Sequence, residues 1–400
     1  MEHKPSPLRK KFWTPGTFVM LAFIVAGGVA IIARFIGGIG YVTNLSDSRP
    51  WGLWVGVDVA TGVALAAGGF TTAALAHIFG RHYYEPVTRP ALLTALLGYT
   101  FVVLGLLVDI GRSWAIWKPL VNWNTNSALF EVAMCVMVYL TVLYIEFIPI
   151  VAEQYKGKVN LPGILSVFNG LLNRFLKIAD AILDKTMWVF IIAGVVLSCM
   201  HQSSLGTLMI IAHTKIHPLW QTPILPLLFL VSAFSVGYPM VVFETTLASA
   251  SFKGDSEIGI LAPLTRITIF LLGAYMALKL GDMWARGSYK YLLDGNYQTN
   301  SFIVEMLMGV MAPWTMLLFE KVRTSRKGVF TASALIIFGV VLNRINVFIV
   351  AYTPPVTQTG YFPAVGEILT TLGFIAGLMF IYRFIVTWLP VLNAPKEVCS

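Results

Sequence analysis

The sequence predicts an all-α integral membrane protein with ten membrane-spanning helices. It is 57% hydrophobic and 12% charged, and its mean hydropathy is +0.76, whereas a soluble domain carries about 25% charged residues. Apolar runs long enough to cross a bilayer recur along all 400 residues. They leave no room for a separate soluble domain, so we expect a single polytopic membrane domain over 1–400.

The apolar runs give the limits of the expected helices. In chain order, we expect spans at 17–36, 52–78, 91–112, 127–152, 187–212, 222–248, 261–281, 299–320, 330–352 and 366–390. The connection 153–186 contains LSVFNGLLNRFLKIADAIL, which mixes apolar and charged positions as an amphipathic helix on the inner membrane surface does. The basic start MEHKPSPLRKKFWTPG runs into an apolar stretch without a clear cleavage site, so we expect an uncleaved first helix.

Lysine and arginine are distributed unevenly between the connections. With the N-terminus inside, seventeen fall in inner segments and six in outer loops. Cytoplasmic segments of membrane proteins carry the excess of positive charge, so both termini are expected in the cytoplasm. This placement accounts for the net charge of +9 without nucleic acid as a partner; the expected surroundings are membrane lipid.

Three carboxylates are expected near the outer face. Asp109 precedes Arg112 by three residues, so the two side chains could pair on one face of the third span. Asp58 and Glu131 should lie at a similar depth. Carboxylates that share a low-dielectric site retain protons more readily, which suits proton donors or acceptors. The alternative for Asp109 is a purely structural pair with Arg112.

A second group of polar residues leads inward. Tyr99 and His201 are expected near mid-membrane, and His201 lies in SCMHQSSLG, where polar residues interrupt an apolar run. Such an interruption indicates a cavity or a hydrated path. Glu131 and Glu146 share one face of the fourth span, and Glu244 lies near the inner end of the sixth. By contrast, we expect three ionisable residues near span ends to reach the interface: Arg34, Lys279 and Glu320.

The sequence offers no redox cofactor of its own. No two histidines fall at matched depth in the spans, as a bis-histidine haem would need, and three scattered cysteines are too few for an iron–sulfur cluster. No metal-binding, dinucleotide-binding or phosphate-binding motif is present. Any electrons must therefore come from another subunit.

Several runs resemble the NrfD/PsrC family of quinone-interacting membrane subunits, and among them those of hydrogenase-2-type nickel–iron hydrogenases. They are PWGLWVGVDVATGVALAAGGF, RPALLTALLGYTFVVLGLLVDIGRSW, NSALFEVAMC, HQSSLGTLMI, HPLWQTP, VVFETTL and YFPAVGEILT. The resemblance implies two four-helix bundles with two additional helices, in a bacterial inner membrane. It also implies a periplasmic ferredoxin-like iron–sulfur subunit, hydrogenase small and large subunits, and menaquinone as the electron acceptor near the outer face.

The resemblance also assigns roles. It implies catalytic acids at Glu131, Asp58 and Asp109, and a quinone site lined by Asp58, Tyr99, Asp109, Arg112 and Glu131. It implies a proton path from the cytoplasm through Tyr99, Glu131, Glu146, His201 and Glu244, with no metal site. Other readings are the same role in a polysulfide or molybdoenzyme complex, a proton-coupled transporter of small solutes, and a structural anchor. A transporter often has paired broken helices, and only the fifth span here has a clear polar break.

Overall fold

A computed structural model describes residues 5–8, 10–252, 258–354 and 360–392. Within these ranges the chain is helical and contains no strand, which confirms the predicted fold class. Ten helices in the described part of the chain are long and apolar enough to cross a membrane. Four of the basic residues used to assign the topology lie outside the described residues: Lys4, Arg9, Lys253 and Lys396.

The helices have the following bounds. They are α1 (Pro15–Gly37), α2 (Ile39–Val42), α3 (Gly62–Leu65), α4 (Ala67–Ala73), α5 (Glu85–Asp109), α6 (Ala128–Tyr155), α7 (Asn169–Ile211), α8 (Leu225–Phe252), α9 (Ile258–Ala285), α10 (Tyr297–Met306), α11 (Ala312–Leu318), α12 (Glu320–Arg323), α13 (Arg326–Ile345) and α14 (Val365–Trp388). π-helical turns at Trp54–Thr61, Ala74–Ile78, Leu307–Met311 and Asn346–Val350 complete three of the spans.

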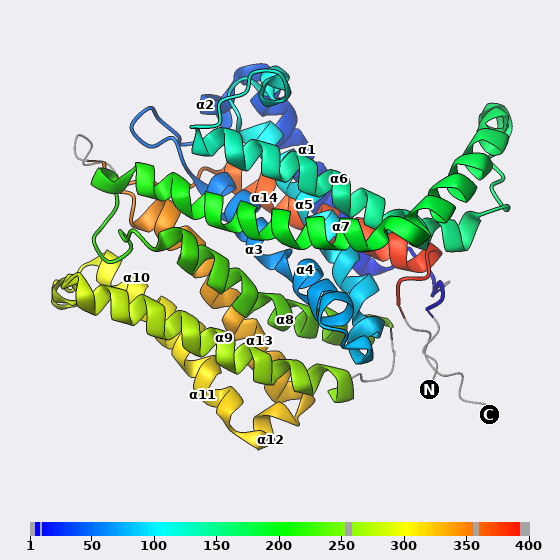
Figure 1. Ribbon diagram of the computed structural model, residues 1–400. Coiled ribbons are helices and arrows are strands. Elements are labelled where there is room, and N and C mark those ends of the chain that lie inside the picture. The colour runs from blue at the N-terminus through cyan, green and yellow to red at the C-terminus, as the bar shows by residue number, and fades with distance from the viewer. Residues whose placement is uncertain (1–4, 9, 253–257, 355–359, 393–400) are drawn as a thin grey trace.

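The spans form two packed groups and a peripheral pair (Figure 1). The first bundle comprises the span Trp54–Ile78 together with α5, α6 and α7. The second bundle comprises α8, α9, the span Tyr297–Leu318 and α13, and it packs on the first through contacts of α8 with α7 and α4. Helices α1 and α14 lie side by side, and α14 packs against α5. This is the arrangement of two four-helix bundles and two additional helices that the family resemblance implied.

The two ends of the bundle differ in what they carry. We call the end where α5, α7 and α9 finish the Asp58 end. At the opposite, terminal end, residues near the two chain termini meet: Ser6 N donates to Leu392 O at 3.1 Å, and Leu8 N to Val386 O at 3.3 Å. The first and last described segments therefore lie on the same side of the bundle.

Helix α7 is longer than the sequence suggested. The expected surface helix and the fifth span are one continuous helix of 43 residues, which at 1.5 Å per residue is about 65 Å long. A hydrocarbon core is about 30 Å thick, so the first half of α7 extends beyond it, and Figure 1 shows this part projecting from the bundle. Its exposed apolar side chains include Leu171, Phe175 and Ile178.

Candidate functional site

Asp58 and Asp109 form a polar site at the Asp58 end. Asp58 lies in the π-helical turn Trp54–Thr61, and its Oδ2 accepts a hydrogen bond from Thr371 Oγ1 of α14 at 2.8 Å. Helix α5 approaches closely because Gly105 has no side chain: a Cβ there would lie 3.3 Å from that of Asp58. Asp109 ends α5, near enough to Asp58 to interact electrostatically, and its buried Oδ1 has no protein partner.

The cation beside this site is Arg34, not Arg112. Helix α5 ends at Asp109, so Arg112 leaves the helical face and is exposed, and the expected Asp109–Arg112 pair does not form. Arg34 is 4% exposed rather than extended to the interface. Its guanidinium donates to Val108 O at 2.6 Å and to Ile110 O at 2.5 Å. These carbonyls lie at the end of α5, where helical acceptors lack intrahelical partners and attract a cation.

Glu367 adds a third carboxylate that sequence reasoning left without a role. It lies in the first turn of α14, is fully buried, and accepts hydrogen bonds from the Tyr361 hydroxyl, from Ala364 N at 2.8 Å and from Asn44 N at 3.1 Å. It lies near enough to Asp109 to interact with it. The signal that could have identified it is its place in YFPAVGEILT.

Glu131 lies apart from these acids. It is in the first turn of α6, is exposed, and its Oε1 accepts from Ser204 Oγ of α7 at 2.6 Å. Among the described residues, no hydrogen bond or ion pair joins it to Asp58 or Asp109. The acids predicted to gather at one depth are therefore two groups, one at α5 and α14 and one between α6 and α7.

Tyr99 and His201 meet in the interior of the first bundle, as their predicted depths suggested. Both are completely buried, and the Tyr99 hydroxyl lies 3.2 Å from His201 Nδ1. Tyr99 also packs edge-on against Tyr139 of α6, with ring centroids 4.5 Å apart. Three buried polar atoms around this contact have no protein partner: His201 Nε2, Tyr139 Oη and Ser198 Oγ. Unpaired buried polar atoms are sites where water binds.

These side chains form two facing stripes. On α7 the stripe comprises Ser204, His201, Ser198 and Gly194, which are spaced by three or four residues and so share one helical face. On α6 it comprises Glu131, Tyr139 and Glu146. Glu131 contacts Ser204, while a Cβ at Gly194 would lie 2.9 Å from Glu146 Oε1. The polar stripe thus runs from the start of α6 to well past mid-helix.

Glu244 is separate from this stripe. It lies on α8 beside Thr94 of α5 and Tyr382 of α14, and its buried Oε1 has no hydrogen-bond partner among the described residues. No hydrogen bond joins it to Glu146 or His201 in the described part of the chain. Of the eight site residues expected from the sequence, Asp58 and Asp109 come together, Tyr99 joins His201, and Glu131 and Glu146 border one stripe. Glu244 and Arg112 stand apart.

These features define a multi-pass membrane protein with two polar centres in one helical bundle. Residues 41–355 match the family model described as polysulphide reductase, NrfD. The chain belongs to the NrfD family.

Individual relatives agree with this assignment. The chain is 32% identical, over 99% of its length and 97% of the relative's, to the probable Ni/Fe-hydrogenase 2 b-type cytochrome subunit of Escherichia coli K12. It is 38% identical to a protein of Nitratidesulfovibrio vulgaris Hildenborough over 96% of each chain. The integral membrane subunit of menaquinone reductase from the same organism is 28% identical over 48% of this chain and 42% of its own.

Proposed function

We propose that this chain is the quinone-reactive membrane subunit of a respiratory complex, and that its complex is a nickel–iron hydrogenase. Membership of the NrfD family and full-length similarity to a hydrogenase-2 subunit support this proposal. The structural observation that carries it is the polar stripe between α6 and α7. Reduction of a quinone needs protons as well as electrons, and this stripe offers a route for them.

The reaction is the transfer of two electrons and two protons to a quinone. Electrons arrive from a partner iron–sulfur subunit at the Asp58 end, and menaquinone is the proposed acceptor. Asp58, Asp109 and Glu131 are proposed to supply protons to the quinone oxygens, while Arg34 offsets negative charge beside Asp109. Tyr99 is a candidate to orient the head group through its hydroxyl. Arg112 was expected to line the quinone site. Because it is exposed, it could do so only where the partner subunit covers it.

Protons consumed at the quinone are proposed to come from the opposite side along the stripe. Glu146 would receive them, and Tyr139, Tyr99 and His201 with intervening water would pass them to Ser204 and Glu131. Glu244, beside Tyr382 at the other end, would serve as an entry point. With both termini in the cytoplasm, as the positive charges predict, this path would carry protons outward from the cytoplasm.

Glu131→Gln tests the proposal in the intact complex. It keeps an acceptor for Ser204 and removes a proton-binding group, so hydrogen-to-menaquinone turnover should fall by about tenfold or more, or about 1.4 kcal/mol in activation free energy. Glu320→Gln, an exposed acid at the other end, is the matched control and should leave turnover unchanged. If the Glu131→Gln complex assembles fully and turns over at the wild-type rate, Glu131 has no part in the mechanism.

The second candidate is the same quinone reaction in a complex without a hydrogenase. The partial similarity to a menaquinone reductase subunit supports this second candidate. Metal analysis of the gently purified complex separates the two: nickel supports a hydrogenase partner, and molybdenum supports a molybdoenzyme.

A further inference from the structure

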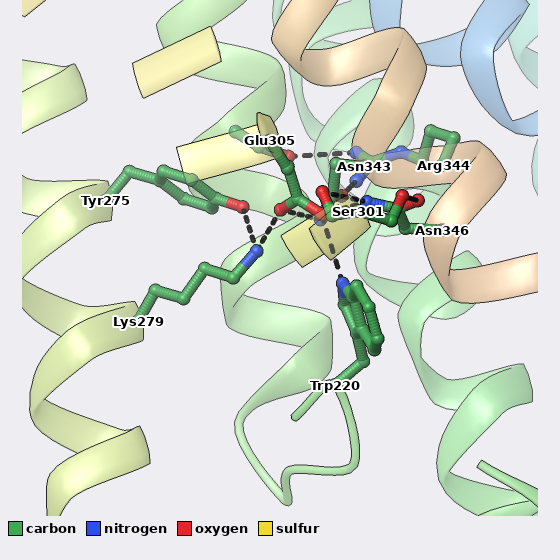
Figure 2. A network of polar contacts seen from close by, with 9 residues as sticks. Trp220, Tyr275, Lys279, Ser301, Glu305, Asn343, Arg344 and Asn346 are labelled. Atoms are coloured by element: carbon green, nitrogen blue, oxygen red, sulfur yellow. Dashed lines mark hydrogen bonds and ion pairs between the residues drawn. The ribbon is translucent and has the colours of Figure 1, made fainter. Parts of the chain in front are cut away.

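The second bundle contains a buried ion pair that the quinone reaction does not use (Figure 2). Lys279 Nζ of α9 pairs with Glu305 Oε1 of α10, and the two side chains are 6% and 1% exposed. Lys279 therefore does not extend to the interface as expected, because Glu305 supplies a partner inside the protein. Glu305 also accepts from Trp220 Nε1 at 3.0 Å, Asn343 Nδ2 at 2.9 Å and Asn346 Nδ2 at 2.7 Å.

The cluster carries more positive than negative charge. Arg344 of α13 is completely buried and lies 3.7 Å above the Phe229 ring. It donates to Ser232 Oγ at 2.9 Å and to Asn343 Oδ1 at 2.7 Å, while its Nε has no partner. Two buried cations around one carboxylate are a costly way to hold helices together, because apolar residues of similar volume do so at no desolvation cost.

Three cavities lie around this pair and between it and the Asp58 end. A cavity of about 450 Å³ lies between the end of α7, the loop 213–224 and the segment Ser288–Leu293. A cavity of about 10 Å³ shares Thr222, Leu225 and Arg286 with it and is lined by Lys279. A third, also of about 10 Å³, is lined by Glu305 but not by Lys279. The two small cavities each approach the size that holds one water molecule.

The ion pair thus separates two water-sized spaces. Lys279 borders the one nearer the surface, Glu305 borders the deeper one, and Tyr275 and Asn343 border both. The deeper cavity is also lined by Leu272, Val310 and Val340. The hydroxyls of Ser232 and Ser235 line it as well. The cavity bordered by Lys279, unlike this one, shares lining residues with the large cavity, so the route to the surface leads to the Asp58 end.

The motif HPLWQTP forms part of the wall of this route. Pro218, Gln221 and Pro223 line the large cavity, and Trp220 reaches inward to Glu305. His217 stacks edge-on against Trp220, with ring centroids 6.0 Å apart. One loop therefore borders the entrance and also hydrogen-bonds to the buried carboxylate.

The span that contains Glu305 and the neighbouring span that donates to it each include a π-helical turn. The turn Leu307–Met311 begins two residues after Glu305, and the turn Asn346–Val350 begins at one of its hydrogen-bond donors. π-Helical turns inside α-helices occur frequently at functional sites. In the first bundle, the π-helical turn Trp54–Thr61 contains Asp58. This observation is independent of the cavities and the charges.

We propose that Lys279 and Glu305 form a proton-exchange site of the second bundle, which takes up and releases protons at the Asp58 end. In the exchange step, the Lys279 ammonium transfers one proton to the Glu305 carboxylate, giving a neutral amine and a neutral acid. The amine then takes a proton from a hydronium ion in the cavity that leads to the surface, which leaves a water molecule. Release is the reverse: the ammonium gives a proton to water in that cavity, and the Glu305 acid returns its proton to the amine. The net change is one proton taken up from, or released to, the Asp58 end.

Other charged and titratable groups surround the pair and set its electrostatics. From α9 they are Tyr275 and Asp282, with Arg286 directly after the helix; from α13, Arg344; from the 213–224 loop, His217; and α8 contributes the hydroxyls of Ser232 and Ser235. Asp282 and Arg286 pair with each other at 2.7 Å, so they add little net charge at the entrance.

Infrared spectroscopy after a rapid pH step tests the proposal on the full-length protein in nanodiscs. The wild type should show a protonated-carboxyl signal that shifts in D₂O and is absent in Glu305→Gln. Leu225→Trp would fill the connection between the two outer cavities, since Leu225 lines both, and should slow the signal by about tenfold. Leu227→Trp, two residues on and 43% exposed, is the matched control and should not slow it.

Two results would overturn the proposal. One is the same carboxyl signal in the wild type and in Glu305→Gln; the other is equal rates in Leu225→Trp and Leu227→Trp. If Glu305→Gln does not fold, the comparison of the two tryptophan variants decides by itself. The nanodisc sample contains no quinone, so the outcome of this experiment is independent of the proposed quinone reaction.

Discussion

Removing either member of the Lys279–Glu305 pair should destabilise the protein, and removing Glu305 should cost more. Breaking a buried ion pair by losing one partner costs about 3–5 kcal/mol. After Lys279→Met, Glu305 keeps three neutral hydrogen-bond donors. After Glu305→Met, Lys279 keeps only the Tyr275 hydroxyl at 3.3 Å and two aromatic rings with centroids at 5.1 and 5.6 Å. Since a hydrogen bond to a charged group contributes about 1.5–3 kcal/mol, the two variants should differ by about 2 kcal/mol.

Thermal unfolding of the full-length protein in detergent measures this difference. The chain contains 11 tryptophans, so intrinsic fluorescence reports the transition. At roughly 1 °C per kcal/mol for a chain of this size, Tm should fall by about 3 °C in Lys279→Met and by about 5 °C in Glu305→Met. The double variant should lose less than the sum of the two. Exposed Lys290→Met is the control. A loss in Lys279→Met that equals or exceeds that in Glu305→Met would refute the reasoning.

Three further predictions follow from single positions. Gly309→Ala should lower Tm because its Cβ would lie 2.3 Å from Gly339 Cα, an overlap that costs about 1–3 kcal/mol; Gly28→Ala, with open space around it, should not. A bis-histidine haem b needs two buried histidines, and His201 is the one described histidine that is buried. The purified protein should therefore show no haem b bands in a reduced-minus-oxidised spectrum, and such bands from this chain alone would contradict the prediction. Burial and a carboxylate partner raise the pKa of Tyr361, so the folded state keeps a proton that the unfolded state loses. Stability should therefore fall as pH rises above about 10, and Tyr361→Phe should remove that part of the loss.

Hydropathy predicted the number and order of the spans because burial in lipid requires long apolar runs whatever the packing. It placed Tyr99 and His201 at compatible depths, and the structure adds that they touch. The limits of α7 were harder to predict. The start of the apolar run suggested a boundary at residue 187, but no proline or glycine interrupts that part of the helix, and the backbone continues.

Partner choice within the membrane could not be predicted from position along a span. Arg34 and Lys279 both lie near helix ends, where a long cation can reach the interface. Whether it does so depends on what the neighbouring helices offer. Arg34 meets the last carbonyls at the end of α5, and Lys279 meets Glu305. Both partners are distant in sequence, so a one-dimensional reading contains no signal for either pair.

The π-helical turns have a consequence for how the sequence should be aligned with its relatives. Each such turn accommodates one residue more than an α-helical turn over the same rise, and the residues beyond it are rotated by about 100°. Deleting one residue within Leu307–Met311 would restore α-helical geometry and turn the following segment to a different neighbour, without altering any loop. One-residue gaps among family members should therefore fall inside these spans, where alignment methods normally forbid them. Forcing such gaps into the loops would shift whole helical faces out of register.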